Sequence, residues 1–205
     1  MPRLTRAERS EQIRRELIAV ARDVFLARGF HGASLEEISE RAGYTRGAVY
    51  SNFDGKEGLF LAVLDEHGAL RVREIVDAAL DSTSFESGLR ACARALAKRP
   101  EADRRWMPVL VEFWTHASHR PDVRKAAHER HERALDAIAA TLAELAAREG
   151  VAYRLPVRSV ARGHMAFVNG WELEQLLDAT ADRTSHFQEM FCSFVLGLVE
   201  EPRPR

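Results

Sequence analysis

Residues 34–53 hold two short amphipathic patterns joined by a glycine, and this arrangement restricts the fold of the chain more than any other feature. Ser34 precedes Glu37 by three residues, the spacing of a capping box, which predicts a helix that begins there and ends at Ala42. Gly43 then suits the positive φ that ends a helix. The predicted inner stripe is Leu35, Ile38 and Ala42, and the predicted outer face is Glu36, Glu37, Ser39, Glu40 and Arg41.

The second pattern predicts a helix that starts at the N-cap residue Thr45. Val49 and Phe53 lie four residues apart and give this helix an inner face. The outer face then carries Thr45, Arg46, Tyr50 and Ser51. Because an arginine there could contact a guanine edge or a phosphate, the pattern predicts a helix-turn-helix whose second helix enters a major groove.

The residues that follow agree with DNA binding without establishing it. Gly47 and Ala48 are small, so a groove wall could approach the helix closely, and Lys56 at the start of the next helix suits a phosphate. The same turn also occurs between helices as an αα-corner with no role in DNA binding. The pattern alone therefore leaves both interpretations open.

The surrounding sequence resembles the TetR family of bacterial regulators at residues 29–38, 42–43, 47–53 and 56–60. The resemblance implies an all-α fold of about nine helices, with a three-helix DNA-binding domain at residues 1–55 and a helical ligand-binding and dimerisation domain at residues 56–205. It also implies a repressor that binds a palindromic operator on double-stranded DNA as a homodimer and is released by a small-molecule effector. The family's DNA-facing positions correspond here to Ser34, Tyr44, Thr45, Arg46, Gly47, Tyr50 and Lys56.

Charge is nearly balanced over the whole chain but not along it. The 205 residues are 46% hydrophobic and 30% charged and carry a net charge of −1, divided as +2 over residues 1–56 and −3 over the rest. The distribution matters more for DNA binding than the total. Arg3, Arg6, Arg9, Arg14 and Arg15 crowd the start, either as an arm that contacts phosphates or as a solvated terminus.

The sequence favours a cytoplasmic protein without structural disulfides. No apolar stretch follows Met1-Pro2-Arg3, so no secretory signal is expected, and no later apolar run is long enough to span a membrane. Cys92 and Cys192 are a hundred residues apart with no second cysteine near either. This spacing excludes a zinc ribbon and predicts two buried free thiols.

Beyond the helix-turn-helix the chain is punctuated by proline and glycine rather than by hairpin turns. One helix is predicted before the helix-turn-helix. A long helix is predicted directly after it, and this helix is expected to transmit a change in one domain to the other. Helices are predicted at residues 7–27, 56–79, 85–97, 103–118, 121–148, 157–178 and 184–199.

Residues near the C-terminus are predicted to form the dimer interface. Ala166 and Gly170 are four residues apart and offer a small-residue surface to another helix, and apolar residues of the last helix would complete a four-helix bundle. The predicted interface is Ala166, Gly170, Phe187, Phe191, Phe194, Val195 and Leu198. The alternative is ordinary intramolecular core, an objection that applies most to Phe191 and Phe194.

Apolar positions interrupted by polar or aromatic residues are predicted to line an effector pocket. The candidates are Leu89, Cys92, Leu96, Met107, Leu110, Phe113, Trp114, Phe167 and Trp171. Such a lining would favour an apolar or aromatic effector. Aromatic residues at helical spacing belong to a core more often than to a pocket, so both assignments remain open.

The histidines do not predict a metal site, and no cofactor is expected. His116 and His119 are three residues apart, as are His128 and His131, which places each pair on one helical face. No cysteine lies nearby, and charged neighbours indicate a solvated surface or polar pocket groups. His164, within an apolar helix, is predicted to be a hydrogen-bonded core residue.

Two other classes of protein remain to be weighed. An enzyme is not expected, because the sequence has no nucleophile elbow, no phosphate-binding glycine-rich loop and no His-Glu-x-x-His motif. A helical ligand-binding adaptor or sensor that lacks specific DNA binding is the main alternative. The presence of Thr45, Arg46, Tyr50 and Lys56 argues against that loss.

Overall fold

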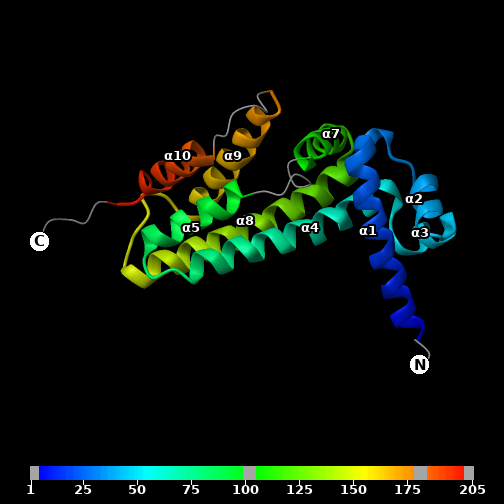
Figure 1. Ribbon diagram of the computed structural model, residues 1–205, viewed down its shortest axis with the longest axis horizontal. Coiled ribbons are helices and arrows are strands. Elements are labelled where there is room, and N and C mark those ends of the chain that lie inside the picture. Colours follow the sequence, from blue (N-terminus) through cyan, green and yellow to red (C-terminus); the bar gives the residue numbers. More distant parts are fainter. Residues whose placement is uncertain (1–4, 99–104, 178–183, 201–205) are drawn as a thin grey trace, which may run out of the picture. The chain divides into compact units, whose positions relative to one another are not determined.

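The computed structural model describes residues 5–98, 105–177 and 184–200, and within these ranges nine α-helices form the protein (Figure 1). The predicted all-α fold is confirmed. The helices are α1 (Arg6–Gly32), α2 (Leu35–Arg41), α3 (Arg46–Asn52), α4 (Gly55–Leu80), α5 (Phe85–Ala97), α7 (Trp106–Ser118), α8 (Pro121–Glu149), α9 (Val157–Gln175) and α10 (Thr184–Leu196). Residues 1–4, 103–104 and 178, which include Arg3 and the ends of two predicted helices, lie outside the described residues.

The chain divides into two compact units. Unit 1 comprises residues 1–68 and 105–127, and unit 2 comprises residues 69–104 and 128–205. Helix α7 thus groups with the helix-turn-helix, and both α4 and α8 contribute residues to each unit. The division of function at residue 55 remains a prediction.

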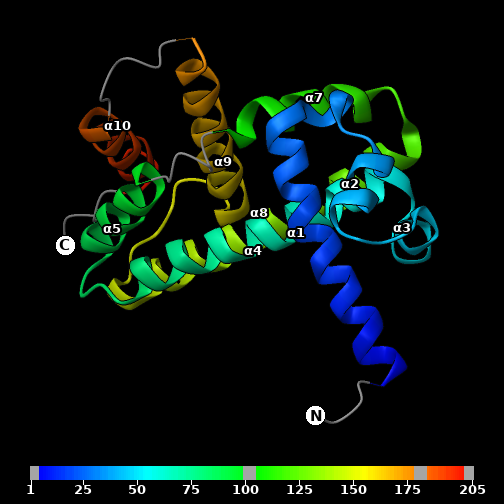
Figure 2. The same ribbon diagram turned by 45° about the vertical axis from the view of Figure 1, so that its right-hand side comes forward.

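Unit 1 is built around a cluster of phenylalanines. Phe30 is fully buried, and its ring lies 5.1 Å from that of Phe60 and 5.2 Å from that of Phe113, measured between ring centroids. These three residues come from α1, α4 and α7, and α7 packs against α1 (Figure 2). The aromatic cluster therefore joins the three long elements that support the helix-turn-helix.

The end of α1 depends on Gly29. Its φ is +74°, a conformation that side chains rarely adopt, and it breaks the regular helix just before Phe30. A Cβ there would lie 2.6 Å from a carboxylate oxygen of Glu112, and the same side chain accepts a hydrogen bond from the backbone N–H of His31 at 3.1 Å. The regular part of α1 therefore stops close to the predicted end at residue 27, and the short segment that runs to Gly32 lies beyond this break.

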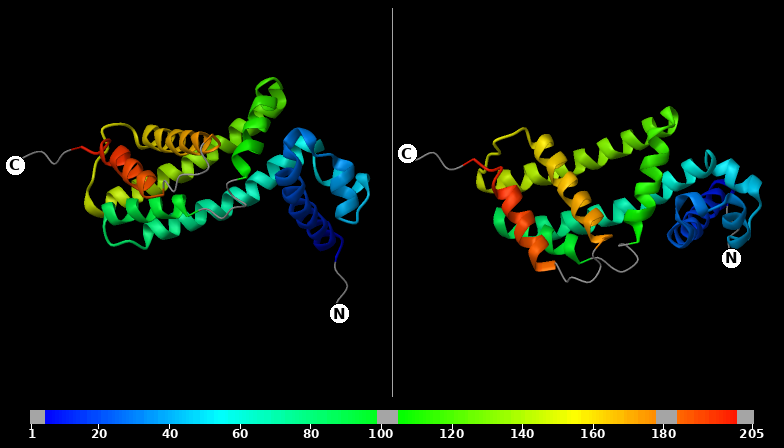
Figure 3. Two further views of the ribbon diagram at one scale, coloured as in Figure 1. Left: turned by 45° about the horizontal axis from the view of Figure 1, so that its top comes forward. Right: turned by 90° about the horizontal axis from the view of Figure 1, so that it is seen from above.

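Unit 2 has its own apolar core, formed by parts of α4 and α8 with α5, α9 and α10. Helix α10 packs against α5 and α9 (Figure 3). The chain after α10 is held by Arg154, whose backbone N–H donates to Leu198 O at 2.8 Å, and by a single bridge between Tyr153 and Val199. Cys92 and Cys192 are buried free thiols, as predicted.

No helix in the described part of the chain is both long enough and apolar enough to cross a membrane.

Candidate nucleic-acid interface and internal cavity

The turn between α2 and α3 has the predicted geometry. Ser34 caps α2 by accepting a hydrogen bond from Glu37 N–H at 3.1 Å, and Thr45 caps α3 by accepting one from Ala48 N–H at 3.3 Å. Gly43 between them has a φ of +73°. Each helix therefore begins and ends where the local sequence places it.

Two details of α2 differ from the prediction. Only half of the capping box forms, because the Glu37 carboxylate pairs with Arg28 at 3.7 Å and Arg41 at 3.6 Å instead of returning to the Ser34 backbone. The outward orientation predicted for Ser39 is wrong. Ser39 is only 2% exposed, and its hydroxyl is satisfied by donating to Glu36 O at 2.9 Å.

Helix α3 buries one side and exposes the side predicted to contact DNA. Val49 is fully buried and Phe53 nearly so, whereas Thr45, Arg46 and Gly47 are exposed and Tyr50 is 55% exposed. The exposed polar groups lie on a helix, an element that the major groove of DNA can admit. This surface matches the groove-facing side predicted from the sequence.

Arg46 is engaged within the chain. Its guanidinium lies 2.7 Å from a carboxylate oxygen of Glu36, and a second nitrogen donates to the Tyr50 hydroxyl at 3.5 Å. Both partners are at least half exposed, so the ion pair is accessible to solvent and weak. A nucleic-acid contact by Arg46 would therefore replace its contact with Glu36.

Two other predicted DNA contacts are held by the chain itself. The Tyr44 hydroxyl donates to a Glu16 carboxylate oxygen at 2.5 Å, which lowers the pKa of Glu16 and raises that of Tyr44. The Lys56 ammonium donates to the carbonyl oxygens of Phe30 at 2.9 Å, Ala33 at 3.2 Å and His31 at 3.4 Å. A phosphate at Lys56 would have to compete with these carbonyls.

Arg14 supports α3 in a way that the sequence did not reveal. Its guanidinium donates to Asn52 O at 2.8 Å and lies 4.5 Å from the centre of the Phe53 ring. A cation at the last carbonyls of a helix satisfies an unpaired acceptor and is favoured by the helix dipole. Arg14 is therefore a positioning residue for α3 rather than a free member of the predicted basic arm.

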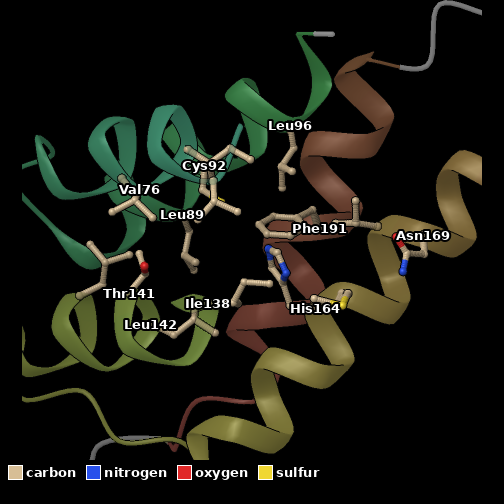
Figure 4. Close-up of a pocket in the computed structure, with 16 residues that line it drawn as sticks. Val76, Leu89, Cys92, Leu96, Ile138, Thr141, Leu142, His164, Asn169 and Phe191 are labelled. Carbon is tan, nitrogen blue, oxygen red and sulfur yellow. The ribbon is translucent and has the colours of Figure 1, made fainter. Parts of the chain in front are cut away.

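Unit 2 contains an apolar cavity of about 130 Å³ between α4, α5, α8, α9 and α10 (Figure 4). Three predicted effector residues, Leu89, Cys92 and Leu96, lie in its wall. The full lining is Val72, Ile75, Val76, Ala79, Leu89, Cys92, Leu96, Ile138, Thr141, Leu142, Leu145, His164, Met165, Val168, Asn169 and Phe191. Burial raises the pKa of the Cys92 thiol to about 12, so the cavity wall holds a neutral thiol at neutral pH.

The other predicted effector residues lie elsewhere. Met107, Leu110, Phe113 and Trp114 belong to α7 in unit 1, where Phe113 is part of the aromatic core and Trp114 is 40% exposed. Phe167 and Trp171 line a surface hollow between α9 and α10. None of these six residues lines the cavity, so the prediction that they contact a ligand has no support from its geometry.

His164 differs from its predicted role as a hydrogen-bonded core residue. Its side chain is buried, and Nδ1 finds no hydrogen-bond partner within the described part of the chain. Its ring points into the cavity and lies edge-on to Phe191, with centroids 5.0 Å apart (Figure 4). Burial lowers the pKa of His164 to about 4, so the imidazole is neutral at physiological pH.

The lowered pKa of His164 predicts a loss of stability at acid pH. An unfolded histidine binds a proton near pH 6.5, whereas folded His164 remains neutral down to about pH 4, so unfolding takes up a proton in this window. The free energy of unfolding should fall by about 3 kcal/mol as the pH drops from about 6.5 to about 4. Urea unfolding of wild type and His164→Phe over this range isolates the effect, because other titrating groups are common to both. Parallel pH profiles would contradict it.

The surface hollow lies on an exposed, largely apolar face of α9 and α10 and is also lined by Glu174 and His186. Ala166 and Gly170 are exposed, and no atom would lie within 4 Å of a Cβ at Gly170. Phe187, Phe191 and Val195, which were predicted to contact a partner, are buried in the chain's own core, and Phe194 and Leu198 are half-buried. The large exposed apolar side chains on these helices and the turn after α9 are Leu173, Leu176, Leu177, Met190 and Leu196.

The histidine pairs lie apart from the cavity lining. His116 Nε2 lies 3.0 Å from a Glu57 carboxylate oxygen, and its ring packs against Phe30. His128 is exposed. Within residues 5–98, 105–177 and 184–200, no three potential metal-binding side chains come together.

Comparison with known families matches both parts of the chain. Residues 17–63 match the model of bacterial regulatory proteins of the tetR family. Residues 85–200, more than half of the chain, match the model of the C-terminal part of BetI-type transcriptional repressors.

Individual relatives agree with this assignment. The transcriptional activator FasR of Mycolicibacterium smegmatis is 34% identical over 110 residues, which are 54% of this chain and 48% of FasR. The transcriptional repressor AcnR of Corynebacterium diphtheriae is 32% identical over 136 residues, 66% of this chain and 65% of AcnR. The matches thus span about half to two-thirds of these relatives.

One solved structure illustrates the likeness in fold. A transcriptional regulator from Saccharomonospora viridis, solved in complex with choline, matches with a TM-score of 0.71 and 19% identity, over 93% of this chain and 100% of that chain. At this identity the likeness concerns the fold alone.

Proposed function

Because the chain belongs to the TetR family of bacterial regulatory proteins, we propose that it is a DNA-binding transcriptional regulator, specifically a repressor released by a small molecule. The observation that carries the proposal is the exposed polar face of α3, with Thr45, Arg46 and Tyr50 outward and Val49 inward. Repression is favoured over activation because the family model that covers residues 85–200 is that of a repressor, although FasR is an activator.

A homodimer would give this surface its specificity. Two copies of α3 held about 34 Å apart fit successive turns of the major groove and hence an inverted repeat. The large exposed apolar side chains of α9 and α10 support dimerisation, because exposed apolar patches often mark protein–protein interfaces. We place the interface at Ala166, Gly170, Phe194 and Leu198, together with Leu173, Leu177 and Met190.

The cavity in unit 2 is the proposed effector site. Helix α4 supplies cavity residues such as Val72 and Ile75 and also carries Lys56 in its first turn. A shift of α4 on ligand binding would thus change residues of both units. Such a shift requires that the ligand bind the DNA-competent and DNA-released states with different affinities.

Selection from randomised duplex DNA at near-physiological salt tests the proposed function. Salt must be fixed, since phosphate contacts make affinity strongly dependent on ionic strength. Enrichment of an inverted repeat would support a dimeric repressor and supply an operator probe. If the folded dimer enriched no sequence, the adaptor interpretation would replace this proposal.

Two substitutions at the Arg46–Glu36 pair should change operator affinity in opposite directions. Replacing Arg46 by Ala should weaken binding about 5- to 150-fold if its guanidinium contacts a base. Replacing Glu36 by Gln should strengthen binding a few-fold, because Arg46 no longer has to leave a carboxylate at 2.7 Å. Fluorescence anisotropy with the selected operator at several salt concentrations measures both. Unchanged affinity in Arg46→Ala would remove this residue from the interface.

A further inference from the structure

The wall of the cavity in unit 2 carries no charged group. Of its sixteen lining residues, all within the described parts of the chain, none is Asp, Glu, Lys or Arg. The neutral state of His164 also leaves no cation to pair with an anionic ligand. Since a buried charge without a partner is strongly disfavoured, the cavity is suited to an uncharged molecule.

Among the described lining residues, the one fully buried polar atom without a partner is Nδ1 of His164. The half-buried Asn169 amide also belongs to the wall. The residue is 6% exposed, its ring points into the cavity, and Nδ1 has no hydrogen-bond partner within residues 5–98, 105–177 and 184–200 (Figure 4). A buried polar atom without a partner is costly, so a molecule that pairs with it gains affinity over an isostere that does not. The site therefore favours an apolar ligand that carries one polar group at the position facing Nδ1.

A hydroxyl is the polar group that fits the available partners. It both donates and accepts, so it is complementary to Nδ1 in either tautomer of the neutral ring. Thr141, on the wall contributed by α8, donates its own hydroxyl hydrogen to Ala137 O at 3.0 Å and keeps only acceptor capacity toward the cavity. A ligand group without a hydrogen to donate could not form a hydrogen bond to the Thr141 hydroxyl oxygen.

The volume limits the size of the ligand. An apolar cavity of roughly 150 Å³ in another protein accommodates benzene. At about 130 Å³, this cavity is sufficient for a single ring or an aliphatic group of similar size.

We propose that the cavity binds a small, uncharged, mainly apolar molecule with one hydroxyl, which hydrogen-bonds to Nδ1 of His164. This ligand class rests on the effector role proposed above and narrows it. It differs from a quaternary ammonium such as choline, the ligand in the S. viridis structure. Among the described lining residues there is no carboxylate, and Phe191 is the only phenylalanine, tyrosine or tryptophan, so the wall lacks the aromatic cage that such cations favour.

Calorimetric titration of the full-length protein at neutral pH with phenol, toluene and choline tests the proposal. Phenol and toluene have the same number of non-hydrogen atoms and differ in the hydroxyl, and choline supplies the cation. The variant His164→Phe keeps a ring beside Phe191 but loses Nδ1. The variant His164→Asn keeps a polar atom at the same distance from the backbone as Nδ1.

The quantity to compare is the ratio of phenol affinity to toluene affinity in each variant, because solvation of the free ligands cancels between proteins. This ratio should fall at least about 5-fold in His164→Phe and recover in part in His164→Asn. Choline should not bind to the cavity. If His164→Phe fails to fold by circular dichroism, His164→Leu provides the same comparison.

Three outcomes would overturn the ligand class: equal ratios in wild type and the variant without Nδ1, choline binding as tight as that of phenol, or no phenol binding by the folded protein. Operator binding measured with and without phenol separates this result from the proposed function. Phenol binding that depends on His164 but leaves operator affinity unchanged would retain the ligand class and refute the effector role.

Discussion

Replacing Phe30 by alanine should lower the free energy of unfolding of the protein by about 3–5 kcal/mol. Phe30 is fully buried and contacts the rings of Phe25, Phe60 and Phe113, so its removal leaves a cavity at the junction of α1, α4 and α7. It also removes the ring that lies 4.7 Å from the Lys56 ammonium. Urea unfolding followed by circular dichroism measures the loss, and operator affinity should fall with the folded fraction.

Tyr50→Ala is the matched control for this prediction. It removes an aromatic ring from the same unit, but Tyr50 is more than half exposed, so stability should change by less than about 0.5 kcal/mol. Operator affinity in this variant should nevertheless fall, because the ring lies on the exposed face of α3. Equal destabilisation by the two substitutions would show that the aromatic cluster does not support unit 1.

The helix-turn-helix was predictable because its determinants are local in sequence. The caps at Ser34 and Thr45, the positive φ of Gly43 and the buried spacing of Val49 and Phe53 each depend on a few neighbouring residues. Helical spacing also predicted most of the helices of both units. Burial of Ser39 was missed, since its hydroxyl is satisfied by the backbone of its own helix and its polarity alone suggested exposure.

The partners of the candidate DNA contacts were not predictable from local patterns. Arg14 reaches Asn52, 38 residues away, and Lys56 reaches the carbonyl of Phe30, 26 residues away. Arg46 finds Glu36 only because α2 and α3 pack at the angle that the turn imposes. These contacts form only when the helices pack together. The sequence contains many other charged residues, and local patterns do not indicate which of them will meet.

The cavity was only partly predictable for a related reason. Leu89, Cys92 and Leu96 are spaced along one face of α5, and that face lines the cavity. Phe113 has the same kind of spacing in α7 but is fully buried in the core of unit 1, because periodicity marks a buried face without indicating what it is packed against. His164 was predicted to be a hydrogen-bonded core residue, because buried histidines usually have hydrogen-bond partners. Only the structure revealed that its Nδ1 has none.

Replacing Gly170 by glutamate should weaken the dimer at least about 100-fold, if the exposed face of α9 and α10 is the interface. A two-fold interface brings the same patch of both subunits together, so each dimer would contain two introduced carboxylates in an apolar contact. The monomer should keep its fold, because a Cβ at Gly170 meets no atom within 4 Å and the residue lies inside a regular helix. Sedimentation equilibrium measures the dissociation constant.

Ala140→Glu introduces the same charge at an exposed position of α8 and should leave the dimer intact. Operator affinity provides the second measurement. A monomer binds one half-site without the gain in effective concentration that the linked second half-site provides, so Gly170→Glu should lose operator binding at protein concentrations where Ala140→Glu still binds. If Gly170→Glu remained a dimer with wild-type operator affinity, the exposed apolar side chains of α9 and α10 would need a different partner, and the interface would lie on another face.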